Sequence, residues 1–198
     1  MNMKFYLKIS SMLVAAAFLS TLPVEAQTFR QTKQGITGTT QGMDIEIQFV
    51  SPEIVRVVKA PEGRSFTKKS LSVVKSPESM SVTTEKKGET VSLKSNAVRV
   101  DFNVETGRIS FFDKQGKALF TEKDYGAQFT PFNDAGNQTF SVRQAFLLDK
   151  DEAIYGLGQQ QVDDLNQRSF IDIGNERVPI CIVRDERREV AVLLINLA

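Results

Sequence analysis

The 198-residue chain contains no histidine, no tryptophan and a single cysteine, Cys181. Without histidine, neither a Ser-His-Asp triad nor a Cys-His pair can form, and a zinc site that needs imidazole is excluded. One cysteine cannot form an internal disulfide, and Cys181 lies in the apolar run 178–183, where a buried, unreactive thiol is expected. The absence of tryptophan removes the widest aromatic platform on which a sugar ring stacks.

An excess of charge of one sign is also missing. The whole chain has 25 basic and 24 acidic residues. A neutral chain without a basic stripe predicts neither a nucleic-acid partner nor binding to an anionic membrane. The pairs Lys68-Lys69 and Lys86-Lys87 are interpreted as solvated turn or edge residues, which discourage edge-to-edge pairing of sheets.

The N-terminus has the layout of a secretory signal peptide. Lys4 and Lys8 precede an apolar stretch over 9–22, and Val24-Glu25-Ala26 offers a small-x-small cleavage site. We therefore expect residues 1–26 to be removed and the mature chain to be periplasmic or extracellular, with no membrane contact after cleavage. A retained membrane anchor is the alternative, although the apolar stretch is short for a bilayer span.

The mature chain alternates apolar and polar residues with a period of two, which is typical of β-strands. The clearest unit is 96–120, in which Val98, Val100 and Phe102 share one face and glycine-containing turns follow at 105–107 and 113–116. This pattern predicts an antiparallel meander rather than βαβ units. Further strands are expected at 44–49, 54–58, 82–85, 90–93, 140–148, 170–173, 178–183 and 190–195, with a hairpin turn at 86–89 and a long loop at 131–137.

No amphipathic helix is evident, so the sequence predicts an all-β, antiparallel β-sandwich. We expect a polar lead over 27–42, part linker and part first strand, followed by one sandwich domain over 43–198. The last strand-like run, 189–195, stops almost at Ala198. This favours a fragment whose sandwich is incomplete at its C-terminus.

The stretch "DEAIYGLGQQQVDDLNQRS" (151–169) interrupts the strand pattern. Asp163 and Asp164 are the obvious carboxylate pair, but neighbours in an extended chain point in opposite directions and rarely converge on one atom. Gly156 and Gly158 lack the third glycine of a dinucleotide-binding loop and more simply let the backbone bend as it leaves a strand. No spaced calcium loop is present either. The sequence thus predicts no metal and no cofactor.

The planar amides of the same stretch suit the recognition of sugar hydroxyls, because each amide both donates and accepts hydrogen bonds. The polar candidates are Gln159, Gln160, Gln161, Asp163, Asn166, Gln167 and Arg168. Tyr155, Phe129 and Phe132 could supply stacking surfaces, but ordinary burial in the core is the alternative for each of them.

The residues "EAIYGLGQQQ" (152–161) and "LNQRS" (165–169) resemble the end of the N-terminal domain of glycoside hydrolase family 31. The segments "NAVRVDFNVETGRISFFDKQGKALFTE" and "NERVPICIVRDERREVAVLLIN" resemble other parts of the same domain, so the pattern covers most of 44–197. The resemblance is weaker after Arg168, where Ser169 stands in place of a common glycine.

The resemblance implies a galactose-mutarotase-like sandwich at the front of a retaining α-glycosidase, such as an α-glucosidase or α-xylosidase. In that family the two catalytic aspartates lie on a C-terminal (β/α)8 barrel, for which 198 residues leave no room beside the sandwich. We therefore expect no catalytic residue in this chain and no activity of the chain alone. The resemblance implies that its partner is the missing barrel, in cis. An α-linked oligosaccharide in the parent enzyme's pocket would contact Gln159, Gln161, Asp163, Asn166 and Arg168.

Two other functions remain open at this point. One is a stand-alone secreted carbohydrate-binding or adhesive sandwich, and the other is a structural module without a ligand.

Overall fold

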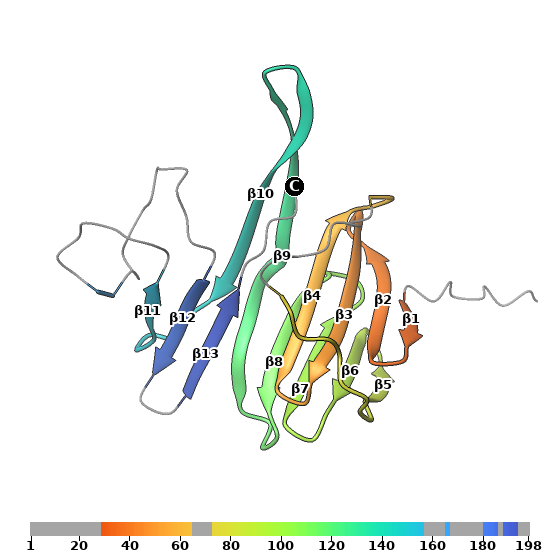
Figure 1. The fold of residues 1–198 in the computed structure, drawn as a ribbon, viewed down its shortest axis with the longest axis vertical. Helices are drawn as coiled ribbons and strands as arrows, with labels where there is room; N and C mark the ends of the chain where they lie inside the picture. The colour runs from red at the N-terminus through yellow and green to blue at the C-terminus, as the bar shows by residue number, and fades with distance from the viewer. Residues whose placement is uncertain (1–28, 65–72, 157–164, 167–179, 186–187, 194–198) are drawn as a thin grey trace, which may run out of the picture.

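The computed structural model describes residues 29–64, 73–156, 165–166, 180–185 and 188–193, and every regular element within these ranges is a β-strand (Figure 1). The strands are β1 (Phe29–Thr32), β2 (Gly35–Thr40), β3 (Met43–Ser51), β4 (Ile54–Pro61), β5 (Thr83–Lys87), β6 (Thr90–Lys94), β7 (Val98–Asn103), β8 (Ile109–Asp113), β9 (Ala118–Asp134), β10 (Asn137–Leu147), β11 (Ala153–Gly156), β12 (Ile180–Asp185) and β13 (Arg188–Leu193). A membrane-spanning helix is accordingly absent from the described ranges.

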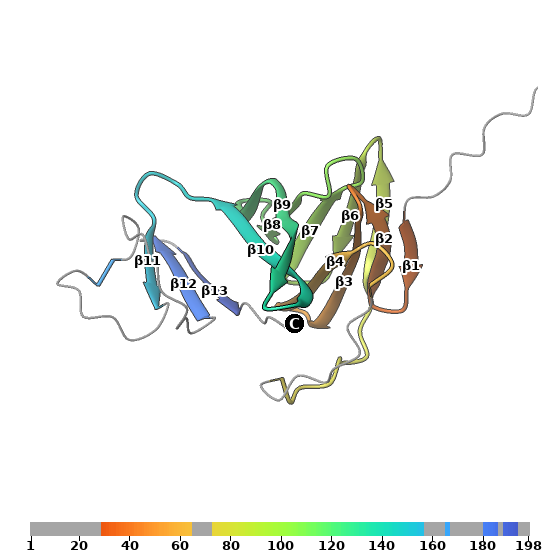
Figure 2. The ribbon, with the colours of Figure 1, turned by 90° about the horizontal axis from the view of Figure 1, so that it is seen from above.

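The strands form three antiparallel sheets. One has the order β1-β2-β3-β4, the second β10-β9-β8-β7-β6-β5, and the third β11-β12-β13. The first two sheets face each other, and the third lies on the far side of β9 and β10 (Figures 1 and 2). The predicted all-β, antiparallel sandwich is confirmed.

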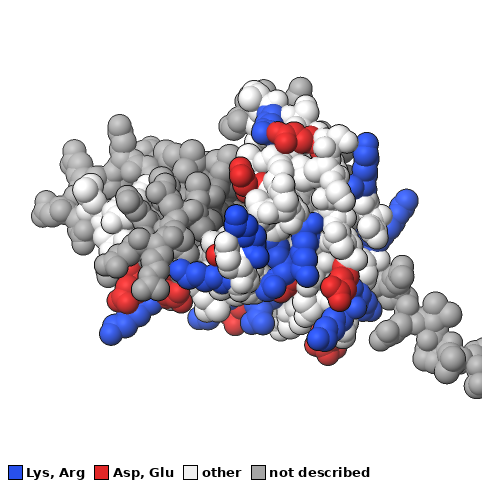
Figure 3. Space-filling model, turned by 90° about the horizontal axis from the view of Figure 1, so that it is seen from below, with Lys and Arg blue, Asp and Glu red and all other residues white. Residues whose placement is uncertain are grey.

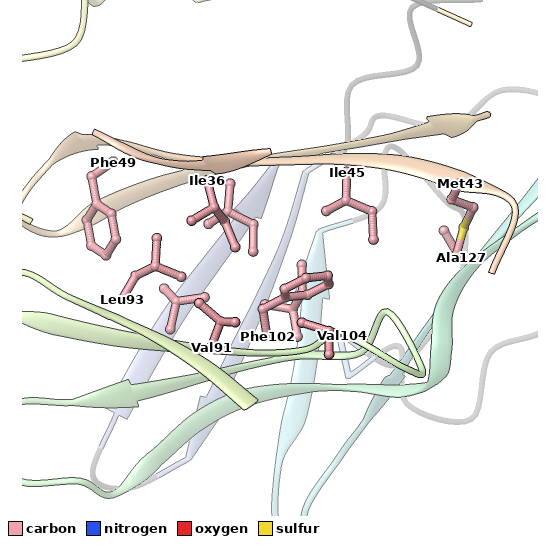
Figure 4. Packing of buried hydrophobic residues seen from close by; sticks show 12 residues of the cluster. Ile36, Met43, Ile45, Phe49, Val91, Leu93, Phe102, Val104 and Ala127 are labelled. Atoms are coloured by element: carbon pink, nitrogen blue, oxygen red, sulfur yellow. The ribbon is translucent and has the colours of Figure 1, made fainter. Parts of the chain in front are cut away.

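The core lies between the four-stranded and the six-stranded sheet (Figure 4). Along β3 every second residue from Met43 to Phe49 is buried, and β6 and β7 bury alternate residues that face it. The buried cluster comprises Ile36, Met43, Ile45, Ile47, Phe49, Val91, Leu93, Val100, Phe102, Val104, Ile109 and Ala127. The period of two seen in the sequence is thus the division between core and solvent.

The expected polar lead over 27–42 is largely strand. β1 and β2 occupy 29–32 and 35–40, and Ile36 is 1% exposed within the core. The part of this segment expected to form a first strand thus contributes two strands to the four-stranded sheet. A short Thr/Gly-rich strand with one core residue resembles a linker because its other side chains are small and polar.

The predicted loop at 131–137 is wrong. β9 continues to Asp134 and β10 starts at Asn137, joined by Ala135 and Gly136, which have φ values of 48° and 98°. A two-residue hairpin turn of type I′ has positive φ at both positions, as found here, and Asn133 Oδ1 accepts a 2.7 Å hydrogen bond from Gly136 N within it. The proline, asparagine and glycine that suggested a loop therefore belong to a long hairpin, which projects beyond the sandwich (Figure 1).

Most of the other predicted strands are present. The hairpin turn expected at 86–89 is confined to Gly88 and Glu89, because β5 extends to Lys87. The runs 178–183 and 190–195 correspond to β12 and β13, which begin and end within two residues of the prediction. The strand predicted at 170–173 lies outside the described residues.

Candidate functional site

Of the five predicted sugar contacts, the structure describes one, Asn166. Its Oδ1 accepts a hydrogen bond from the backbone N–H of Ile154 in β11, at 3.1 Å. The end of the loop is therefore tied to the strand from which the loop departs. Gln159, Gln161, Asp163 and Arg168 lie outside the described residues, as do Gln160, Asp164 and Gln167.

The strand that leads into the loop is fixed at both of its ends. Before β11, the buried Glu152 accepts a 2.7 Å hydrogen bond from Asp149 N through Oε2 and closes a turn. At the end of β11, Gly156 has a φ of 97° and pairs with Cys181 of β12. A positive φ at the last residue of the strand is a conformation that glycine adopts readily, and the bend predicted after it lies outside the described residues.

The three candidate stacking aromatics differ in their environments. Phe129 is partly buried and packs against the core cluster. Phe132 is 52% exposed and Tyr155 is 37% exposed, so neither is a core residue. Tyr155 lies on β11, directly before the loop.

A buried ion pair is the main polar feature that sequence reasoning missed. Lys59 Nζ of β4 lies 2.6 Å from Oε2 of Glu122 in β9, and both side chains are 5% exposed. Lys59 Nζ also donates to the carbonyl oxygens of Gly107 (2.9 Å) and Tyr125 (3.0 Å). A buried ammonium needs such a set of acceptors, because an unpaired charge in a core is strongly unfavourable.

Glu122 has a matching set of donors. Besides Lys59, Ile109 N donates to Oε2 at 2.8 Å and Gln144 Nε2 donates to Oε1 at 3.0 Å. Burial raises the pKa of Glu122 and lowers the pKa of Lys59, while their mutual attraction opposes both shifts. The cluster joins the edge of the four-stranded sheet to β8, β9 and β10.

A sequence signal for this pair does exist. Lys59 is in phase with Val55 and Val57, which pack against the core, and Glu122 is in phase with buried Phe120. Two opposite charges at inward positions of different strands are the pattern to search for.

Among the described residues, no group of three histidine, cysteine, aspartate or glutamate side chains could hold a metal ion.

A family model, the glycosyl hydrolase 31 N-terminal galactose mutarotase-like domain, matches residues 44–180, more than half of the chain. The chain belongs to this family. Its resemblance to family 31, first drawn from 152–161 and the flanking strands, is confirmed by this match.

Individual relatives support the assignment to family 31. An α-xylosidase of Saccharolobus solfataricus is 30% identical over 118 residues, covering 59% of this chain and 16% of that protein. The family 31 α-xylosidase of Xanthomonas citri superposes with a TM-score of 0.69 at 30% identity, covering 78% of this chain and 18% of that enzyme. At 20% identity, a family 31 dextranase of Flavobacterium johnsoniae, complexed with glucose, shares the fold with a TM-score of 0.61.

The family 31 domain thus spans about a sixth of the length of these relatives. In the related enzymes the corresponding domain sits beside a catalytic barrel.

On the face seen in Figure 3, basic and acidic side chains of the described residues are interspersed.

Proposed function

We propose that this chain is the N-terminal accessory domain of a secreted α-glycosidase and that its 157–168 loop forms one wall of the enzyme's sugar pocket. The observation that carries the proposal is the family match over 44–180, together with 30% identity to an α-xylosidase of which the chain covers only 16%. Gln159, Gln161, Asp163, Asn166 and Arg168 are the proposed sugar contacts. Hydrolysis of the glycosidic bond requires two carboxylates supplied by a barrel.

The chain alone should be catalytically silent. The buried carboxylates among the described residues are Glu122 and Glu152. Glu122 is committed to Lys59, Ile109 and Gln144, and Glu152 to a backbone N–H, so both serve the fold. Neither carboxylate is placed to protonate a leaving group.

Localisation is part of the proposal. Cleavage after Ala26 would release a mature chain that starts at Gln27, in the periplasm or outside the cell. N-terminal sequencing of the protein from a secreting host tests this directly. A first residue of Met1 would point to a retained anchor.

Domain replacement tests the accessory role. The mature chain is fused to the barrel of the Xanthomonas citri α-xylosidase in place of that enzyme's own N-terminal domain, and hydrolysis of an aryl α-xyloside is measured. We expect no turnover by the chain alone and greater activity of the fusion than of the isolated barrel. An isolated barrel as active as the fusion would contradict the proposal.

The loop is tested within the same fusion. Asp163→Asn and Arg168→Ala should raise KM or lower kcat/KM, whereas Lys114→Ala, in the exposed turn after β8, should leave both unchanged. Sugar-dependent thermal stabilisation of the chain without any barrel would instead support a stand-alone binding module, because a ligand stabilises only the state that it binds.

A further inference from the structure

A groove separate from the 157–168 loop opens between the projecting hairpin and the four-stranded sheet. One wall is the turn between β2 and β3, at Gln41 and Gly42, together with Pro61 at the end of β4. The other wall is formed by the outer part of β9 with Phe140 of β10. Its volume is about 480 Å³, within the range of small-molecule sites, and it is open to solvent.

The strand register explains why this wall is aromatic. Ala127, Phe129 and Pro131 alternate along one face of β9, and Phe140 lies opposite Pro131 on the same face. The face is covered by the sandwich at Ala127, which is 3% exposed, and extends beyond the core toward Phe140. The rings of Phe129 and Phe140 meet edge-to-face with centroids 6.3 Å apart. The core-facing side of the hairpin thus continues outward as an aromatic surface.

Gln41 and Tyr125 are two of the polar residues that line the groove. Gln41 Nε2 donates a 2.6 Å hydrogen bond to Glu105 O, which holds the amide plane and leaves Oε1 as an acceptor. Tyr125 is 41% exposed, and its own carbonyl is held by Lys59 Nζ. Positive φ at Asp124 (53°) and Gly126 (77°) bends the strand on either side of the tyrosine.

The lining residues themselves carry no charge, but the guanidinium of Arg64 lies over the Phe140 ring, 5.9 Å from its centroid. Arg64 supplies hydrogen-bond donors beside this ring, and no lining carboxylate or ammonium offers an ionic partner, so the groove suits a neutral ligand rich in hydroxyl groups. A pyranose ring has a C–H face that packs on aromatic rings and hydroxyls that pair with a phenol and an amide. This combination of groups fits a neutral sugar better than a nucleotide, a phosphate or a carboxylate.

We infer that this groove is a second saccharide site, which takes one or two neutral pyranose units against Tyr125, Phe129 and Phe140. Its location and neutrality follow from the described residues. The choice of glucose- and xylose-containing probes rests on the proposed function.

The chain's own tyrosines allow a direct test. It has no tryptophan and three tyrosines, and in the mature chain from Gln27, which lacks Tyr6, only Tyr125 and Tyr155 remain to fluoresce. Adding Tyr155→Phe leaves a reporter in the groove, and adding Tyr125→Phe instead leaves a reporter next to the loop. Each protein is titrated with xylose, glucose and isomaltotriose. We expect a saturable change from Tyr125 at millimolar sugar.

Matched variants on the hairpin assign the effect to the groove. Phe140→Leu should weaken binding about fivefold, as expected for the loss of one ring contact. Phe132→Leu, on the opposite face of the same hairpin, should leave binding unchanged. The proposal is overturned if Tyr125 gives no saturable response, or if both variants weaken binding equally.

The test also separates this inference from the proposed function. If the accessory role is wrong, the fusion fails to gain activity while the Tyr125 response can still saturate. If the groove does not bind sugar, the Tyr125 titration is flat while the fusion and its loop variants behave as expected. Preference for a proline-rich peptide over all three sugars in the same titration would also overturn the assignment of ligand class.

Discussion

Lys59 and Glu122 are 63 residues apart in sequence, yet their side chains meet at 2.6 Å between the two sheets of the sandwich. The pair is buried, and each partner has additional hydrogen bonds to backbone or amide groups. A buried ion pair of this kind contributes little more to the free energy of folding than a well-packed apolar pair would. Removing only one partner is nevertheless strongly destabilising, because the other charge is then buried without a counter-ion. The contact therefore provides the sharpest stability experiment that this fold offers.

Lys59→Met should lower the free energy of unfolding by about 3–5 kcal/mol at neutral pH, because Glu122 is left buried without its cation. The surface pair Lys75–Glu78, whose side chains are 47% and 49% exposed, provides the control, and Lys75→Met should cost at most about 1 kcal/mol. Urea unfolding of both variants measures the difference. Equal losses would mean that the buried pair behaves as an exposed one. The double variant Lys59→Met/Glu122→Leu should regain most of the loss.

The two single variants should respond to pH with opposite signs. Without Lys59, burial holds the pKa of Glu122 above its ordinary value of 4.5, so the loss of stability grows as pH rises through that raised pKa. In Glu122→Gln, burial holds the pKa of Lys59 below its ordinary value of 10.5, so the loss grows as pH falls through that lowered pKa. Urea unfolding of both variants at pH 5, 7 and 9 tests this, and parallel slopes would contradict it.

Gly126→Ala should be more destabilising than Gly88→Ala. Both glycines have positive φ, 77° and 59°, so alanine is strained at either position. A Cβ at Gly126 would also collide with the Glu122 carboxyl group, whereas a Cβ at Gly88 meets nothing within 4 Å. We expect about 1 kcal/mol for Gly88→Ala and clearly more for Gly126→Ala, measured by thermal unfolding. Equal melting temperatures would show that the carboxylate moves aside without cost.

Asn166→Ala should expose the backbone N–H of Ile154, because its acceptor is removed. The expected cost is about 1 kcal/mol, seen as faster hydrogen exchange at the Ile154 amide rather than as global unfolding. Asn166→Asp keeps an acceptor oxygen and should retain the protection. If both variants exchange alike, Asn166 does not tie the end of the loop to β11.

Phe102→Ala should cost about 3–5 kcal/mol, because the ring is fully buried between the sheets. Phe132→Ala removes an equally large side chain that is 52% exposed on the hairpin and should cost far less. Denaturant midpoints compare the two. Similar midpoints would mean that the hairpin face of Phe132 is covered by something that the described residues do not show.

Much of the sandwich could be predicted from the sequence because strands with one buried face alternate strictly. Val98 to Phe102 and Asp44 to Phe49 are clear examples. The hairpin around Ala135 and Gly136 could not be predicted in this way, because its outer part buries little apolar surface and its composition is that of a loop.

The buried ion pair could not be predicted from the sequence for a different reason. Lys59 and Glu122 each read as surface residues when taken alone, and only the packing of β4 against β9 brings them together. Of the candidate site, the sequence located the loop after β11, and Asn166 is the one predicted contact whose partner is now visible.

The projecting hairpin has a practical consequence. Its tip at Ala135 and Gly136 contributes nothing to the buried cluster, and a Cβ at Gly136 meets no atom within 4 Å. Lengthening a surface loop costs only about 0.6 kcal/mol for each doubling. The tip is therefore the place to open the chain and insert an epitope or a dye-binding peptide, and the sandwich should fold around its core as before.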